Sequence, residues 1–231
     1  MNKQKITTIG MVVAMDKEIT PFLKSVGEEF LCEQKGQYTV YGYNSGDKKI
    51  YLVKSGIGEI FAASATQMLI SEYKPQLIMN FGVCGSLVKN LSVMKTVIVK
   101  GVVHYDFDLS EIDNVKVGQY PGYETPIISA ESDFYNVVKR VVTNADEAVC
   151  ASADKFVANP KIKQYLNETF GATVCDMECA GVLLTAKGSN IPCVIIKAVS
   201  DGEGGAEEFN ALVHQASEVY ISAIKSLIEE F

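Results

Sequence analysis

The chain has 231 residues, of which 48% are apolar, enough for one α/β domain with a well-covered core. Acidic residues outnumber basic ones by 28 to 21, the net charge is −7, and no basic run occurs. This balance excludes the electrostatic footprint of a nucleic-acid-binding protein, so we expect no nucleic acid partner.

The apolar run from Ile9 to Met15 is far too short to span a bilayer, and no cleavage-type signal follows it. We therefore expect an unprocessed, soluble, cytoplasmic protein with no membrane partner. The six cysteines form no CxxC pair, and the two histidines, His104 and His214, do not lie near them in the sequence. Reduced, buried thiols without a metal or another cofactor are the prediction.

The first buried strand is predicted over residues 6–14, and a helical pattern follows it at once. Glu18 therefore lies just beyond the carboxyl end of a strand. Residues 38–43 and 49–54 alternate in polarity and are typical of a strand pair around a turn at 44–47. A flexible loop at 55–58 then leads into a helix predicted for 59–73.

A second buried strand at 77–81 runs into the segment 82–86, for which two glycines predict a turn. This segment lacks both the G-x-G-x-x-G spacing and the lysine of a P-loop, so we expect backbone approach to a ligand, not dinucleotide binding. A third strand is predicted over 93–103. The irregular segment that follows, up to about Ser129, is long for a plain connection, which indicates a functional or interfacial role.

Helices are predicted over 133–142, from Pro160 toward Phe170, and over 209–228, with an extended segment at 148–151. The apolar stripe of the last helix indicates core packing. A further strand at 192–198 delivers Ser200 and Asp201 to its carboxyl end.

Residues 172–181 place two carboxylates and a methionine where an apolar segment turns helical. Glu178 lies near the start of a helix predicted for 179–187, where the helix dipole favours its charge, and Met177 offers a soft apolar surface. A carboxylate beside such a surface is suited to binding a sugar, because the carboxylate accepts hydrogen bonds from the hydroxyl groups and the methionine contacts the carbon face. On the local pattern alone, an ordinary helix start with an acidic first turn is equally good.

Buried strands that alternate with helices predict a mainly parallel sheet, in which ligands bind at the carboxyl ends of the strands. Glu18, Glu178 and Asp201 would then share one pocket. Two acids in different surroundings can divide the roles of proton donor and base in glycosidic cleavage, and a third can hold the sugar. Each acid taken singly is also compatible with a plain helix cap.

Several segments, in order along residues 8–225, resemble the 5′-methylthioadenosine/S-adenosylhomocysteine nucleosidases of the purine nucleoside phosphorylase superfamily. They are 14–18 (AMDKE), 54–58 (KSGIG), 80–82 (NFG), 118–122 (GQYPG), 176–178 (DME) and 199–201 (VSD). The resemblance implies one α/β domain over residues 1–231, with three layers and a central mixed, mostly parallel sheet flanked by helices. It implies hydrolysis of the N-glycosidic bond of an adenine nucleoside: 5′-methylthioadenosine, S-adenosylhomocysteine or 5′-deoxyadenosine.

The resemblance also implies roles for the catalytic residues. Glu18 matches the general base that activates water, and Asp201 matches the general acid at purine N7, supported by Ser200. Protonating the leaving base needs an acid that stays protonated near neutrality, which a dry pocket provides by raising the pKa of the carboxyl group.

The same resemblance implies a set of substrate-binding residues. Glu178 binds the ribose hydroxyls and Met177 packs on the sugar. The ring of Phe156 stacks on adenine, while the backbone of Val157 contacts the edge of the base. The 5′ side of the pocket and the turn beside it are formed by Ile57, Met15 and Val83.

Several positions depart from the family pattern, among them Cys84 and Ser86 in the segment after the second strand, and three departures bear on the site. Val83 replaces a small hydroxyl residue, Lys197 replaces an arginine, and Ala206 falls where an aromatic residue often closes the 5′ pocket. These changes touch the 5′ end or the nucleophile side and leave the purine side intact. Family members are usually homodimers in which the loop 107–122 helps to complete the neighbouring site, and the resemblance implies the same assembly here.

Two alternatives stay open. A nucleoside phosphorylase of the same fold would need to bind phosphate, which such enzymes hold with arginine, and Arg140 is the only arginine of this chain. A lysine could replace arginine as a point charge, so this alternative stays open. We expect Arg140 to be a solvated residue on a polar helix face, which disfavours phosphorolysis. The second alternative is a non-catalytic nucleoside-binding protein, but such a protein has no need of Glu18.

Overall fold

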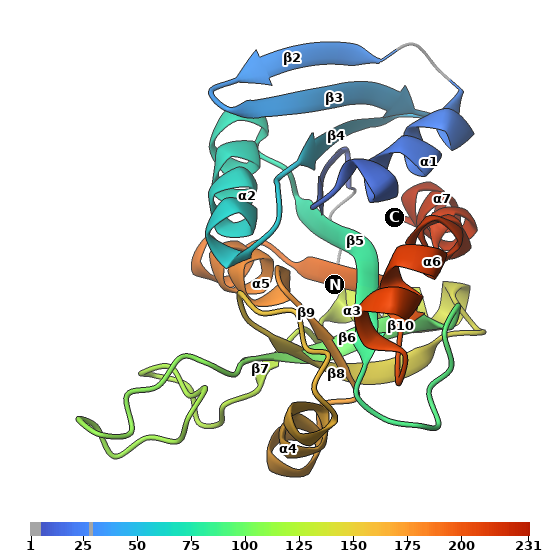
Figure 1. Cartoon of the computed structure of the whole chain (residues 1–231). Coiled ribbons are helices and arrows are strands. Elements are labelled where there is room, and N and C mark those ends of the chain that lie inside the picture. The colour runs from blue at the N-terminus through green and yellow to red at the C-terminus, as the bar shows by residue number, and fades with distance from the viewer. Residues whose placement is uncertain (1–5, 28–29) are drawn as a thin grey trace.

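A mixed β-sheet runs through the molecule in the computed structural model, which describes residues 6–27 and 30–231 (Figure 1). Its path runs β10-β6-β8-β9-β5-β1-β4-β3-β2, and β7 pairs with β6. The strands are β1 (Thr8–Val13), β2 (Leu31–Lys35), β3 (Tyr38–Ser45), β4 (Lys48–Lys54), β5 (Leu77–Ser86), β6 (Thr96–His104), β7 (Ile128–Ser129), β8 (Asp146–Ser152), β9 (Val174–Asp176) and β10 (Cys193–Asp201).

The sheet closes on itself at one end. β10 pairs with β5 in parallel and with β6 antiparallel, so β5, β10, β6, β8 and β9 form a continuous ring of pairings. β1 and β4 continue from β5 in parallel, and β3 and β2 follow antiparallel. Because β1, β4, β5 and β10 all run the same way, their carboxyl ends meet at one edge, where ligands bind in such sheets.

Helices cover both faces of the sheet. They are α1 (Asp16–Val26), α2 (Glu59–Tyr73), α3 (Asp133–Val141), α4 (Pro160–Phe170), α5 (Cys179–Gly188), α6 (Gly205–Val219) and α7 (Ile221–Glu230). α1, α3, α6 and α7 pack on one face around Phe22, Phe81 and Tyr220, whereas α2 and α5 pack on the other around Leu69 and Leu183. The predicted three-layer α/β class is confirmed. A single domain over residues 1–231 stays a prediction, and its first five residues lie outside the described ones.

Most predicted elements form close to their expected bounds, but two predictions are wrong. The segment 82–86 is not a turn: it is the second half of β5, because pairing with β10 and β9 keeps it extended. The last helix is also not continuous. It is divided into α6 and α7 at Tyr220, whose ring packs against Phe81 in the core.

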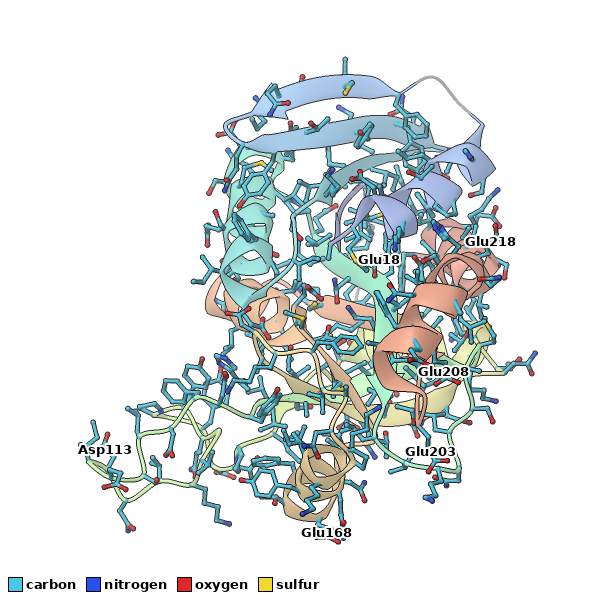
Figure 2. The ribbon with its side chains drawn as sticks, viewed as in Figure 1. Glu18, Asp113, Glu168, Glu203, Glu208 and Glu218 are labelled. Carbon is cyan, nitrogen blue, oxygen red and sulfur yellow. The ribbon has the colours of Figure 1, made fainter. Side chains whose placement is uncertain are left out.

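The irregular segment between β6 and β7 projects away from the body of the molecule (Figure 1). Figure 2 places Asp113 at its far end, and the neighbouring Ile112 has 78% of its surface exposed. Near the body, the rings of Phe107 and Tyr120 stack with centroids 3.9 Å apart, and the Tyr120 hydroxyl lies 2.8 Å from His104 Nδ1. The base of this segment is therefore held by side-chain contacts, while an apolar side chain is exposed at its tip.

Across the described ranges 6–27 and 30–231, no helix has the length and apolar character needed to cross a membrane.

Candidate active site

Glu18 lies where α1 meets β5, with only 3% of its surface exposed (Figure 2). Its Oε2 accepts the backbone N–H of Met15 at 2.8 Å and its Oε1 accepts that of Val83 at 2.8 Å. Burial raises the pKa of Glu18, while Lys197 and these backbone donors act in the opposite direction. A carboxylate has about four acceptor sites, so two remain for other donors such as a water molecule.

The backbone beside Glu18 has no room for a side chain. A Cβ on Gly82 would lie 2.4 Å from Glu18 Oε1, and Gly82 has φ of +154°. Glycine at this position is thus what allows the carboxylate to lie directly against β5. The N–H of Val83, the next residue, completes the contact.

Asp201 ends β10 and is also buried. Its Oδ1 lies 2.9 Å from the Ser200 hydroxyl, which is also 3.2 Å from the Cys84 carbonyl oxygen. Burial raises the pKa of Asp201, against the lowering effects of Ser200 and Lys163. The predicted Ser200-Asp201 pair is therefore in contact, and its surroundings favour the protonated acid.

Lys163 is a site neighbour that the sequence did not indicate. Its Nζ donates to the carbonyl oxygens of Gly202 at 2.6 Å and Ser86 at 3.1 Å, and lies 3.8 Å from Asp201 Oδ2. It comes from α4 and ties the ends of β5 and β10 together. A lysine in a helix is usually exposed, so no local signal in the sequence marks it as buried.

Glu178 is the N-cap residue of α5, as the sequence predicted. Its Oε1 accepts the N–H of Gly58 at 3.0 Å, which joins the loop before α2 to the start of α5. Burial, together with the charge of Asp176, raises the pKa of Glu178 to about 8. Met177 beside it is half-buried.

The predicted base-binding and 5′ residues lie at strand ends or on the loops that follow them. Val157 is buried, whereas Phe156 is 47% exposed and meets Phe209 edge-on, with centroids 5.5 Å apart. Ile57 is half-exposed on the loop after β4, and Met15 packs at the edge of the core.

Phe209, the first residue of the apolar stripe predicted for the last helix, is half-buried against the core and also meets Phe156. Ala206, the position where an aromatic residue was missing, is exposed one helical turn earlier. The i to i+3 relation on α6 is the signal that would have identified Phe209 as the aromatic residue near this pocket.

Lys197 and Asp176 form a buried ion pair whose lysine acts on two of the three acids, Glu18 and Glu178. Lys197 Nζ lies 2.9 Å from Asp176 Oδ2, and each side chain is only 2% exposed. Burial opposes the charge on Lys197, but Asp176, Glu178 and Glu18 outweigh it and raise its pKa. Asp176 also accepts the N–H of Cys179 at the start of α5, so it bonds nearby backbone as well as Lys197.

One group of three potential metal ligands occurs among the described residues. Cys150, Asp176 and Cys179 each offer an atom within 4.8 Å of the others. The carboxylate of Asp176 is already engaged by Lys197 and by the Cys179 N–H, and burial raises the pKa of both thiols. This chemistry favours a hydrogen-bonded cluster with neutral thiols, which are poor metal ligands.

Comparison with known proteins identifies the family of the chain. Residues 8–231 match the family model of the phosphorylase superfamily. An aminodeoxyfutalosine nucleosidase of Helicobacter pylori is 29% identical, covering 97% of this chain and 99% of the relative. A 5′-methylthioadenosine/S-adenosylhomocysteine nucleosidase of Buchnera aphidicola is 31% identical, covering 89% and 88%.

A solved structure extends the likeness to three dimensions. The 5′-methylthioadenosine/S-adenosylhomocysteine nucleosidase of Helicobacter pylori, complexed with an amino-pyrrolopyrimidine compound that carries a propynylthiomethyl group, superposes with a TM-score of 0.93. It is 27% identical, and the match covers 99% of this chain and 100% of that one.

Proposed function

The chain belongs to the phosphorylase superfamily, and from this premise we propose that it is a nucleosidase. It hydrolyses the N-glycosidic bond of adenine nucleosides, with 5′-methylthioadenosine, S-adenosylhomocysteine and 5′-deoxyadenosine as candidate substrates. The observation that carries the proposal is Glu18, a buried carboxylate fixed by two backbone N–H groups at the shared edge of the parallel strands. Relatives named for methylthioadenosine and for aminodeoxyfutalosine support glycosidic hydrolysis as the shared reaction and leave the 5′ group open.

The proposed mechanism assigns one task to each acid. Glu18 accepts a proton from water, whose oxygen forms the new bond to C1′ as the bond from C1′ to N9 breaks. Asp201 gives its proton to N7, so adenine leaves neutral, and the raised pKa of Asp201 supports this role. Glu178 binds the ribose hydroxyls. Ser200 holds Asp201 in place.

The binding residues surround the substrate in this proposal. Met177 packs on the sugar, Phe156 stacks on adenine and the backbone of Val157 meets the base edge. The 5′ group lies toward Ile57 and Met15, near Val83. Phe209, edge-on to Phe156, supports the exposed ring on the base side.

The contacts of the cations favour hydrolysis over the phosphorylase alternative. Arg140 pairs with Glu230 at 2.6 Å, on the outer side of α3 and α7. Lys197, which acts on Glu18 and Glu178, is engaged by Asp176. Lys163, which lies beside Asp201, donates to the carbonyl oxygens of Ser86 and Gly202. These contacts disfavour a phosphate clamp, and the arrangement of Glu18 goes beyond what a non-catalytic binding protein requires.

We expect the protein to release adenine and free 5′-substituted ribose from methylthioadenosine in phosphate-free buffer. The assay incubates the protein with methylthioadenosine, adenosylhomocysteine, 5′-deoxyadenosine and inosine, with and without phosphate, and the products are separated by chromatography. A sugar 1-phosphate formed only when phosphate is present would establish phosphorolysis instead. Tight binding without turnover would establish the non-catalytic alternative.

We further propose a cytoplasmic homodimer that acts in nucleoside catabolism and methionine salvage. The six cysteines are unpaired, which supports a reducing compartment. Five of them are buried as predicted, whereas Cys32 on the edge strand β2 is exposed, contrary to the prediction. Large apolar side chains that are exposed on α2 and at the tip of the projecting segment support a partner surface: Ile60, Phe61 and Ile112.

Light scattering at micromolar concentration is expected to give twice the chain mass of 25.2 kDa. Replacing Ile60 with Asp places a charge in the proposed interface and should shift the mass toward one chain. A single-chain mass for the unmodified protein over the whole concentration range would contradict the dimer.

A further inference from the structure

Glu59 is a buried acid for which the proposed reaction has no task. It is the first residue of α2 and has 6% of its surface exposed. Its Oε2 accepts the N–H of Gly181 in α5 at 2.5 Å, and its own N–H donates to Asp154 Oδ1 at 2.7 Å. The side chain thus joins the start of α2 to α5.

The helices approach each other so closely here that a side chain would not fit. A Cβ on Gly181 would lie 2.4 Å from the Glu59 carbonyl oxygen and 2.9 Å from its Oε2. The start of α2 follows directly on Gly58, whose N–H binds Glu178. The position of the Glu59 carboxyl group therefore fixes the backbone that meets Glu178.

The contacts of Ser152 decide how many protons the acids of this cluster carry. Ser152 Oγ lies 2.5 Å from Glu59 Oε1 and 2.6 Å from Asp176 Oδ1, and it accepts the N–H of Ala180 at 3.2 Å. A serine hydroxyl has one hydrogen and can donate it to only one of the two carboxyl oxygens. Two ionised carboxylates would leave one oxygen facing another oxygen without a hydrogen between them. One of the two acids therefore carries a proton.

Asp176 is not the protonated partner. Lys197 lies 2.9 Å from its other oxygen and the Cys179 N–H also donates to it, and the balance lowers its pKa despite burial. Among the ion pairs of residues 6–27 and 30–231, none includes Glu59.

Two charged groups, Asp176 on β9 and Asp154 after β8, raise the pKa of Glu59, whereas the hydrogen bonds from Ser152 and the Gly181 N–H lower it. The other titratable groups nearby are Tyr105 and Tyr120 beyond β6 and the thiols of Cys150 and Cys179 around Asp176. Burial first and Asp176 second raise the pKa of Glu59 to about 7. The lone cation of the cluster, Lys197, is engaged by Asp176.

We propose that Glu59 is a positioning residue held as a neutral carboxylic acid, donating to Ser152 Oγ while Ser152 donates to Asp176. This series of hydrogen bonds holds the start of α2 against β8, β9 and α5. It thereby positions the Gly58 N–H to donate to Glu178. The link to ribose binding rests on the proposed function, whereas the protonation of Glu59 does not.

The proposal has a defined pH dependence. The folded protein retains the Glu59 proton between the ordinary pKa of 4.5 and about 7, whereas the unfolded chain releases it. Stability from this group is therefore fully present below pH 4.5 and is lost as the pH rises to about 7. Above that pH, two carboxylates face the same hydroxyl group, and the hydrogen-bonded link between Glu59, Ser152 and Asp176 is weakened.

Glu59→Gln is the matched variant, because the glutamine amide donates to Ser152 and its oxygen accepts from Gly181 at every pH. Infrared difference spectra of the two proteins at pH 6 should show one protonated carboxyl band that is absent from the variant and titrates away near pH 7. The KM for methylthioadenosine should rise on the order of tenfold more in the wild type than in the variant between pH 6 and pH 8.5, the effect of about one lost hydrogen bond.

Glu59 is not among the main groups that shift the pKa of Glu178, so Glu178 is expected to titrate near pH 8 in both proteins and its contribution is removed by comparison with the variant. Absence of the carboxyl band, or identical pH profiles of unfolding and KM in both proteins, would overturn the inference. Infrared and unfolding measurements need no substrate. A protein that shows the band but cleaves no nucleoside would therefore contradict the proposed function and leave the protonation of Glu59 supported.

Discussion

Replacing Glu18 with glutamine is expected to lower kcat for methylthioadenosine by about a thousandfold and to leave its dissociation constant almost unchanged. Glutamine cannot accept the proton of the attacking water. The sugar and the base are held by other residues in the proposed site, so binding survives. Single-turnover kinetics measure the chemical step, and titration calorimetry measures binding directly.

The environment of Glu18 makes direct binding measurements necessary. Both of its oxygens accept a backbone N–H, so either orientation of a glutamine amide sets its NH₂ group against Met15 or Val83. The resulting unpaired donor costs about 1–3 kcal/mol locally, which should appear in the free energy of unfolding. Any fall in kcat that is larger than this unpaired donor explains is attributed to the loss of the general base.

Glu168→Gln is the control for the change in charge. Glu168 lies on the outer side of α4, away from Glu18, where it accepts a hydrogen bond from Gln164 (Figure 2). This variant should keep wild-type kcat and binding. A Glu18→Gln protein that retains turnover, or one that loses affinity in proportion to kcat, would show that Glu18 is not the base.

The positions of the three acids were predictable because they follow from strand ends. Glu18 and Asp201 come directly after buried apolar runs, and Glu178 opens a helix that glycine ends, so local patterns place all three. Helix α4 was equally clear, since Pro160 begins it and Gly171 follows it. These signals depend on residues that are neighbours in the sequence, so tertiary contacts do not change the structure that they predict.

Contacts between segments that are distant in the sequence determine the features of the fold and site that the sequence did not predict. The second half of β5 looks like a turn because of Gly82 and Gly85, yet two neighbouring strands hold it extended. Burial of Glu59 and Lys163 was equally hidden, because residues distant in the sequence supply their partners. Lys197 stood out as a departure from the family, but its pairing with Asp176 is visible only in the fold.

Lys197→Met is expected to lower the free energy of unfolding at pH 7 by about 3–5 kcal/mol, measured by urea denaturation. The substitution leaves Asp176 buried without its cation, among groups that cannot replace the charge. Because Lys197 helps to hold the pKa of Asp176 below its ordinary value of 3.8, the loss should shrink as the pH falls and Asp176 becomes protonated. Lys197→Arg keeps the charge and should lose much less.

A double variant separates the lost charge from lost packing. If the penalty of Lys197→Met comes from the unpaired carboxylate, adding Asp176→Asn should restore part of the stability, since a neutral amide can still accept the Cys179 N–H. If the penalty comes from a cavity, the two losses should add. Recovery would show that the main task of Lys197 in folding is to neutralise the buried Asp176 carboxylate, while its charge also lowers the pKa of Glu18 and Glu178.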